Sequence, residues 1–199
     1  MSRVQSKPMT ADEFLAWEAD QELKWEFDGF QPVAMTGGTA AHAAVQANLI
    51  TALTIRLRGK PCRPFGSDLK VQTGPGYRYP DASVSCTPFP LSDAVIAEPV
   101  VIFEVLSTST SGYDRTVKLA EYQALPSVRR CVLLEQDRVF ATVISRTDAG
   151  WDHALVGQDG PLAIPEIGVE IPMAELYDGL ALVAKPQPTA SAPASSEPL

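Results

Sequence analysis

Residues 77–89 read "YRYPDASVSCTPF", and residues 100–110 read "VVIFEVLSTST". In the first stretch, polar side chains alternate with less polar ones from Asp81 onward, directly after Pro80. The second has the length and β-branched content of a buried strand. Each carries an acid in an unexpected place: Asp81 opens its strand, and Glu104 lies inside the most apolar run of the chain, where a charge is costly. These two predicted strands therefore decide how both the fold and the site are interpreted.

Helices and further strands are predicted on both sides of this pair. Thr10 and Glu13 have the spacing of a capping box, which predicts a short helix that ends near residue 20. Asp28-Gly29 lies between two alternating segments and predicts a hairpin. The other predicted elements are helices at 40–58, 112–125 and 173–180, strands at 68–73, 129–135, 138–145 and 150–156, and loops at 73–80 and 87–99. This order predicts an α/β fold in which helices flank a central mixed β-sheet.

The length of 199 residues suits one domain, which we place at residues 1–182, and a Pro/Ala/Ser-rich tail at 183–199 is expected to be disordered. No run approaches the roughly 20 apolar residues that span a bilayer, and no secretory signal opens the chain. Three widely spaced cysteines without a CxxC pair argue against a disulfide framework or a zinc site. A cytoplasmic protein with reduced cysteines and no membrane partner is therefore expected.

The charge of the chain is unevenly distributed. A net charge of −8 argues against a protein that coats nucleic acid non-specifically. Residues 56–78 nevertheless contain six basic residues and one acid. Two interpretations of this basic segment stay open: it is a surface that contacts nucleic acid, or it is a solvated helix end followed by a loop.

The surroundings predicted for Glu104 require a compensating group. Strand alternation places Glu104 on the same face as Ile102 and Leu106, and burying a carboxylate there costs several kcal/mol unless a cation, a metal ion or a proton compensates. A structural ion pair and a strand-end glutamate that reaches solvent are the alternatives. Lys118 lies on the next predicted helix, on one face with Asp114, Glu121 and Tyr122. It can reach over the end of the strand, or it can form an exposed pair with Asp114.

Two carboxylates and a lysine form a chemically coherent set. Acids from neighbouring strands suit a hard cation such as Mg²⁺, for which Mn²⁺ can substitute, and such a cation retains waters and binds phosphate oxygens. The bound cation activates water and stabilises charge on a phosphate, while a nearby lysine adds electrostatic stabilisation. Asp81, Glu104 and Lys118 are therefore the candidate catalytic residues.

A proline-aspartate pair followed by a hydrophobic strand that ends in an acid resembles the PD-(D/E)XK nuclease superfamily. Within it, the chain resembles the Uma-two-like family of restriction-endonuclease-like proteins. The likeness covers residues 10–180 and rests on four stretches in the family's order: "WEFDGFQPVAM", "YPDASV", "VVIFEVLSTST" with "YDRTVKLAEYQAL", and "VRRCVLLEQDRVFATVISR". The resemblance implies a restriction-endonuclease-like mixed sheet with extra β-hairpins. It also implies metal-dependent hydrolysis of DNA phosphodiester bonds.

The resemblance also assigns roles to residues. It implies metal ligation by Asp81 and Glu104 with help from the Val105 carbonyl, and a supporting carboxylate at Glu26. One position departs from the superfamily pattern, because Leu106 stands where the motif has lysine. In this family the lysine is expected on the following helix, at Lys118.

Other interpretations remain beside the nuclease. The family often has a histidine near His42, which we list as a supporting residue, although a helix-cap or core role is the stronger interpretation from the sequence. The chain can also be a catalytically inactive nuclease-fold module for binding or regulation, or Glu104 and Lys118 can form a purely structural ion pair. DNA is the partner that the resemblance implies. A homodimer is a further expectation, since superfamily members are often dimeric.

Overall fold

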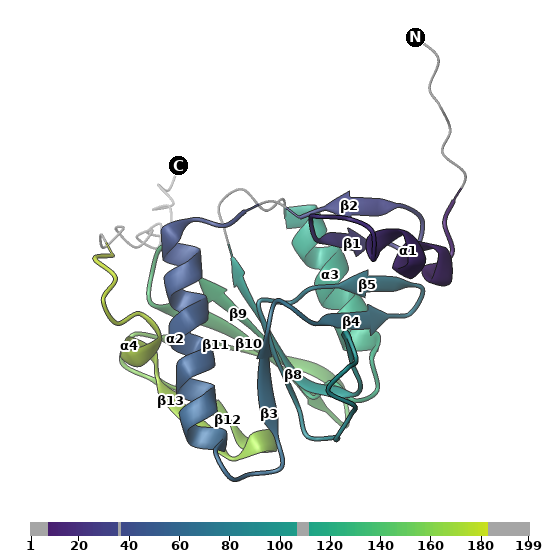
Figure 1. Ribbon diagram of the computed structural model, residues 1–199. Coiled ribbons are helices and arrows are strands. Elements are labelled where there is room, and N and C mark those ends of the chain that lie inside the picture. Colours follow the sequence, from purple (N-terminus) through teal and green to yellow (C-terminus); the bar gives the residue numbers. More distant parts are fainter. Residues whose placement is uncertain (1–7, 36, 107–111, 183–199) are drawn as a thin grey trace, which may run out of the picture.

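The computed structural model describes residues 8–35, 37–106 and 112–182, without the side chains of 113–115 (Figure 1). The predicted tail at 183–199 and the side chain of Asp114 lie outside this part. A six-stranded sheet occupies the centre, in the order β11-β10-β9-β8-β6-β3. Its strands are β3 (Arg63–Gly66), β6 (Ala82–Ser85), β8 (Pro99–Leu106), β9 (Arg130–Glu135), β10 (Phe140–Thr147) and β11 (Gly150–Gly157). Because β8 runs parallel to β9 and antiparallel to β6, the predicted mixed sheet is confirmed.

A second sheet of five short strands carries the N-terminal helix. Its order is β2-β1-β5-β4-β7, with β1 (Trp25–Phe27), β2 (Pro32–Ala34), β4 (Lys70–Thr73), β5 (Gly76–Arg78) and β7 (Val95–Ile96). Helix α1 (Ala11–Glu18) begins after Thr10, and the predicted capping box with Glu13 is present. Phe14 of this helix packs against the rings of Phe27 and Tyr77. The predicted hairpin is confirmed as the antiparallel pair of β1 and β2.

Helices cover both faces of the six-stranded sheet (Figure 1). Helix α2 (Ala40–Leu57) packs on one face through Val45, Leu49 and Leu53, which share a cluster with Phe103 of β8. Helix α3 (Gly112–Ala124) packs on the other face through Tyr122. The elements β12 (Pro161–Ile164), η1 (Pro165–Ile167), β13 (Val169–Pro172) and α4 (Met173–Leu176) join the α2 side. Within the described ranges, no helix combines the length and apolar character needed to cross a bilayer.

Several short strands were not predicted. The stretch 73–80, expected to be a loop, contains β5, and the loop expected at 87–99 contains β7 and the start of β8. Strand β3 and the β12–β13 hairpin were also missed. Close approach explains the glycine that opens β5, since a Cβ at Gly76 would lie 2.5 Å from the carbonyl oxygen of Phe27. These strands have two to four residues each, too few for a clear period.

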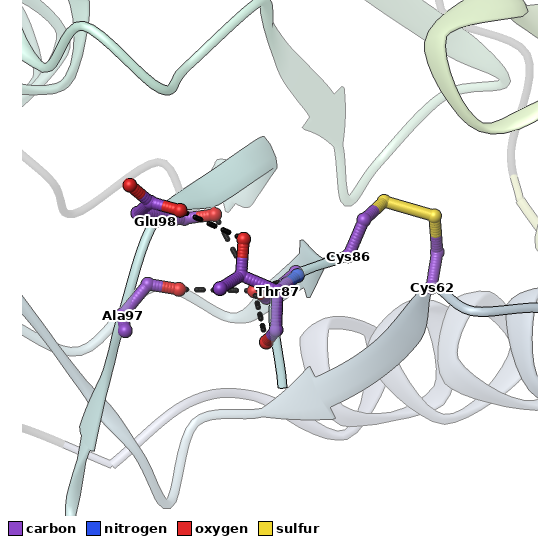
Figure 2. The surroundings of a disulfide bond; sticks show 6 residues. Cys62, Cys86, Thr87, Ala97 and Glu98 are labelled. Carbon is purple, nitrogen blue, oxygen red and sulfur yellow. Dashed lines mark hydrogen bonds between the residues drawn. A yellow bond between two sulfur atoms is a disulfide. The ribbon is translucent and has the colours of Figure 1, made fainter. Parts of the chain in front are cut away.

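The expectation of reduced cysteines is wrong for one pair, because Cys62 and Cys86 form a disulfide (Figure 2). Strands β3 and β6 are antiparallel with Arg63 opposite Ser85, so the next positions outward are Cys62 and Cys86. Cross-strand neighbours of this kind bring the two thiols together, although 24 residues separate them in sequence. The third cysteine, Cys131, is free and buried. A spacing argument cannot find such a bond because it depends on strand register.

Candidate active site

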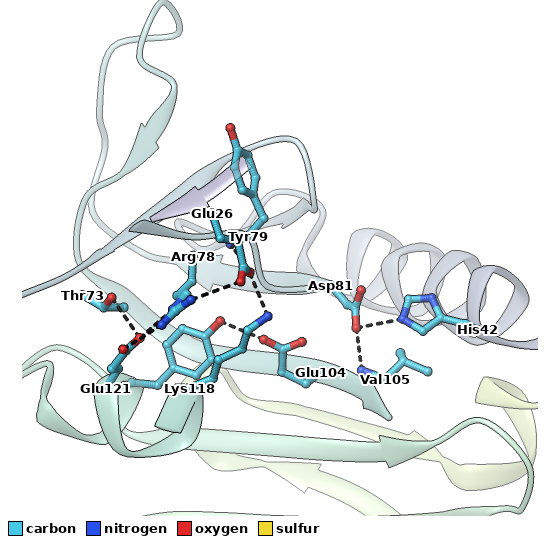
Figure 3. A network of polar contacts seen from close by, with 11 residues as sticks. Glu26, His42, Thr73, Arg78, Tyr79, Asp81, Glu104, Val105, Lys118 and Glu121 are labelled. Carbon is cyan, nitrogen blue, oxygen red and sulfur yellow. Dashed lines mark hydrogen bonds and ion pairs between the residues drawn. The ribbon is translucent and has the colours of Figure 1, made fainter. Parts of the chain in front are cut away.

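Strand pairing places Asp81 beside Glu104. In the antiparallel pair of β6 and β8, Ala82 lies opposite Phe103. The next position outward on each strand is Asp81 and Glu104, and directly opposite residues have Cβ atoms about 4.5–5.5 Å apart. Figure 3 shows Asp81 and Glu104 at this end of the sheet, with the Asp81 carboxylate directed toward His42 and Val105. The two acids singled out in the sequence therefore form one site.

Backbone and helix groups fix the orientation of Asp81. Its Oδ2 atom accepts a hydrogen bond from the Val105 amide at 2.7 Å and lies 3.2 Å from Nε2 of His42. The side-chain amide of Gln46 donates to the Asp81 carbonyl at 2.7 Å. Two contacts from α2 and one from β8 therefore hold the aspartate at the start of β6. Gln46 carried no signal in the sequence, because its role depends on where α2 crosses the sheet.

The ring of His42 contacts Asp81 from the first turn of α2. The cap of this helix is Thr39, whose hydroxyl accepts a hydrogen bond from the His42 backbone amide, so the His42 side chain is not the cap. The hydrogen bond to Asp81 raises the pKa of His42 above its ordinary value, against the opposing effect of burial. The position of the ring is therefore compatible with the supporting role predicted for His42.

Glu104 is partly buried on the α3 side of the sheet. Its Oε1 atom accepts a hydrogen bond of 2.8 Å from the Tyr122 hydroxyl. Burial first, and then the negative charge of Asp81, raise the pKa of Glu104 from 4.5 to about 8, while the charge of Lys118 acts in the opposite direction. A site that makes ionisation this costly would gain from a bound cation.

Lys118 reaches the site from α3, and a buried acid holds it there. Its Nζ atom donates to Oε1 of Glu26 at 2.8 Å, and the Glu26 side chain is only 5% exposed. Glu26 also accepts from the Tyr79 amide and from Arg78, each at 3.3 Å. Figure 3 shows the ammonium group between Glu26 and Glu104. The lysine predicted to reach over the end of β8 therefore lies there.

Arg78 joins this network to helix α3. Its Nε and Nη2 atoms donate to the two carboxylate oxygens of Glu121 at 2.7 and 2.8 Å. Glu121 also accepts from the Thr73 hydroxyl at 3.2 Å. The sequence places Arg78 in the basic segment and Glu121 and Tyr122 on the helix face of Lys118, and it predicts none of these contacts. The helical spacing was the signal that could have linked them to the site.

The donor set suits a hard cation that keeps several waters. Among the described residues, neither Oδ1 of Asp81 nor Oε2 of Glu104 accepts a hydrogen bond, so each acid retains one oxygen for a ligand. No cluster of three or more His, Cys, Asp or Glu side chains of metal-binding geometry occurs in the described ranges. Mg²⁺ commonly binds through one or two carboxylates and completes its shell with water and phosphate oxygens. The two acids fit that requirement, and the Val105 carbonyl is a prediction for a third donor.

The basic segment does not form one continuous surface. Arg56 forms a bidentate salt bridge with Glu175. Lys70 forms an ion pair with the buried Glu18, and Arg78 forms ion pairs with acids in the site. Half of the segment's positive charge is therefore paired with acids, at the surface for Arg56 and in the interior for Lys70 and Arg78. The remaining basic residues, Arg58, Lys60 and Arg63, are exposed. Neither interpretation of the segment holds in full, since it combines buried ion pairs with a smaller exposed cluster.

Comparison with known proteins places this geometry in a family. A family model described as "Uma2: Putative restriction endonuclease" matches residues 11–187. The chain belongs to the Uma2 family. The resemblance seen in the sequence is therefore confirmed, and it extends over almost the whole described part of the chain.

Two relatives come from Synechocystis. The Uma2 chain is 32% identical over 177 residues to a protein described as "Uncharacterized protein slr1290", covering 87% of this chain and 93% of the relative. It is 29% identical over 136 residues to "Uncharacterized protein sll1609", covering 66% of this chain and 77% of that protein. Neither description states an activity.

A solved structure supports the fold. A crystal structure from Anabaena variabilis, described as "a putative nuclease belonging to DUF820", superposes with a TM-score of 0.71. The match covers 85% of this chain and 98% of the other at 18% sequence identity. At that identity the likeness shows a shared fold, and the expected nuclease-like α/β class is confirmed.

Proposed function

We propose that this Uma2 protein is a divalent-metal-dependent endonuclease that hydrolyses phosphodiester bonds in DNA. The observation that carries the proposal is the pair formed by Asp81 and Glu104 on adjacent strands, each with one carboxylate oxygen left for a ligand. Restriction-endonuclease-like families generally use a divalent metal. We take Mg²⁺ as the metal and Mn²⁺ as its substitute, because the donors are hard oxygens.

Asp81, Glu104 and the Val105 carbonyl are the groups that would hold the cation. When bound, such a cation supplies an activated water and neutralises charge on the scissile phosphate. Ligation requires Glu104 to be ionised, which burial and Asp81 oppose in the free protein. The Tyr122 hydroxyl keeps donating to Oε1, so the second oxygen of Glu104 stays directed at the site.

Lys118 supplies positive charge beside the metal ligands. Its ammonium group is held by Glu26, so it is positioned before substrate arrives. A cation fixed there stabilises negative charge as it develops on the phosphate during attack by water. Glu26 acts on the reaction through Lys118, and His42 acts through Asp81. Both are therefore positioning residues in this proposal.

One observation favours a second candidate, a binding or regulatory module without catalysis. The Lys118 ammonium already pairs with a buried carboxylate, which reduces its field at a neighbouring phosphate. The net charge of −8 also disfavours tight binding of DNA outside the site. Such a module would bind metal and nucleic acid but leave the DNA intact.

Cleavage of defined DNA substrates separates the two candidates. Supercoiled, linear, single-stranded and branched DNA would be incubated with purified protein in Mg²⁺ and, separately, in EDTA. We expect Mg²⁺-dependent cleavage that falls about a hundredfold or more in Asp81→Ala. The control is Asp152→Ala, which removes an exposed acid on the edge strand β11 and should cleave at the wild-type rate. Equal trace cleavage by wild type and Asp81→Ala would reject the enzyme in favour of the binding module.

A further inference from the structure

A second concave site lies at the other end of helix α2. A pocket of about 520 Å³ opens between the last turn of α2 and strand β3. Its lining includes three cations, Arg58, Lys60 and Arg63, together with apolar groups such as Leu57 and Pro64. The volume lies within the range of small-molecule sites, about 300–1,000 Å³.

The Arg58 side of this pocket is far from Asp81 and Glu104. His42 contacts Asp81 from the first turn of α2, whereas Arg58 follows the last residue of the same helix. A rise of 1.5 Å per residue over this interval separates the two positions by roughly 24 Å along the helix axis. Arg58 therefore lies well away from the proposed metal ligands, while Phe65 of the same lining lies opposite Ser83, two residues from Asp81.

The three cations of the pocket are not neutralised by acids within the described ranges. Neither Arg58 nor Arg63 forms an ion pair there, and the Lys60 ammonium donates to the Gly168 carbonyl at 3.1 Å. The other basic residues of the segment all bind carboxylates. In a chain of net charge −8, an exposed cluster of three cations around a cavity is a local exception.

The helix dipole accounts for only two of the three cations in this cluster. Cations near a helix C-terminus interact favourably with its partial negative charge, by about 0.3–1 kcal/mol, and this explains Arg58 and Lys60. Arg63 belongs to β3, beyond the disulfide at Cys62, where the effect of the last helical turn no longer reaches. The disulfide also ties the start of β3 to the end of β6 and so fixes the wall that carries Arg63.

We propose that this pocket binds a phosphate monoester with an attached ring system, of the class of a nucleoside 5′-phosphate. Guanidinium groups bind phosphate through two parallel hydrogen bonds, which suits Arg58 and Arg63, and Lys60 adds a point charge. The Thr54 hydroxyl, also in the lining, is a further donor, and the partly exposed Pro64 and Phe65 give an apolar surface for a base. The phosphate can belong to a free nucleotide or to the 5′ end of a DNA strand. The proposal does not depend on nuclease activity.

Titration calorimetry on the full-length protein tests the proposal, with EDTA present so that no metal bridges a phosphate to Asp81. The probes are inorganic phosphate, thymidine 5′-monophosphate, and a short single-stranded oligonucleotide with a 5′ phosphate. We expect the monophosphate to bind one-to-one and equally well to wild type and Asp81→Ala. Arg58→Glu and Arg63→Glu should each weaken binding at least tenfold. Arg129→Glu, which makes the same charge change at another exposed site, should change it less than twofold.

The two phosphate sources give different patterns. If the oligonucleotide binds more tightly than the monophosphate, and the same two variants weaken its binding, the ligand is a DNA end. If the monophosphate binds as tightly as the oligonucleotide, the ligand is a free nucleotide. Because Arg63 lies beside the disulfide, Arg63→Gln is a milder second variant and should weaken binding several-fold with an unchanged melting temperature. Absence of saturable binding at millimolar probe, an equal loss in Arg129→Glu, or loss in Asp81→Ala would overturn the proposal. Inorganic phosphate binding as tightly as the monophosphate would overturn the role of the apolar surface.

Discussion

Replacing Glu104 by glutamine tests the electrostatics of the site in two opposite directions. Glutamine keeps the size of the side chain and an oxygen that accepts from the Tyr122 hydroxyl, but it carries no charge. In the metal-free protein the pKa of Glu104 rises from 4.5 to about 8 through burial and the charge of Asp81. At about 1.4 kcal/mol per pH unit, this rise corresponds to a cost of up to about 5 kcal/mol when Glu104 ionises.

The sign of the effect follows from proton binding. Between pH 4.5 and about 8 the folded protein keeps a proton on Glu104 that the unfolded chain has lost, so the free energy of unfolding falls as pH rises. The glutamine of Glu104→Gln does not ionise, so the free energy of unfolding of this variant does not fall for this reason. We therefore expect the variant to gain stability relative to wild type as pH rises through this window, with a constant difference above it. Taking the difference between the two proteins cancels the titrating groups that do not interact with Glu104.

A divalent cation should act in the opposite direction and stabilise wild type more than the variant. Mn²⁺ binds the ionised carboxylate, so it stabilises wild type, by about 2.7 kcal/mol at a hundredfold excess over its dissociation constant. The variant has lost one ligand and should gain much less. Urea unfolding from pH 5 to 9, in EDTA and then in Mn²⁺, measures both effects, with Glu22→Gln as an exposed control. A pH-independent difference in EDTA, or equal stabilisation of both proteins by Mn²⁺, would refute the reasoning.

Further predictions concern single elements of the fold and site. Lys118→Ala should slow plasmid cleavage about a hundredfold while the shift in melting temperature with Mn²⁺ persists; loss of both would mean that the lysine builds the metal site. Arg78→Ala leaves Glu121 without its cation and Glu26 with Lys118 alone, and should lower the free energy of unfolding by about 3–5 kcal/mol in urea titrations; a change below 1 kcal/mol would contradict the network. Joint replacement of Cys62 and Cys86 by alanine should cost about 3.5 kcal/mol, from the entropy of a loop of this length, and wild type in reductant should match the variant. Thr10→Ala should cost about 1 kcal/mol by thermal melting, because it removes the α1 cap, and an unchanged melting temperature would contradict that role.

The sequence predicted the elements whose signals are local. The capping box at Thr10, the period of α2 and the apolar run of β8 each contain their evidence within one segment. In the β12–β13 hairpin, Leu162 and Ile164 alternate with exposed residues, but four residues per strand are too few for a clear period. Strand β3 follows Gly59 and Pro61 and contains Pro64, in a stretch that is typical of a loop.

The contacts that complete the site depend on tertiary structure. Sequence alternation placed Glu104 on the face of Ile102 and Leu106, but only the register of β6 against β8 sets Asp81 beside it. Likewise, Arg78 was counted among exposed cations, although it is 3% exposed and pairs with acids from β1 and α3. Long-range ion pairs and the Cys62–Cys86 bond follow from strand order, which composition and spacing do not encode.

The proposed metal site is open to observation by diffraction. Data from a crystal soaked in Mn²⁺, collected near the manganese absorption edge, would show each bound ion as an anomalous peak. We predict a peak within about 2.0–2.3 Å of one oxygen of Asp81 and one of Glu104, near the range for small divalent cations on oxygen. Absence of that peak at saturating Mn²⁺, or a peak that contacts neither carboxylate, would contradict the assignment of these two acids as the metal ligands.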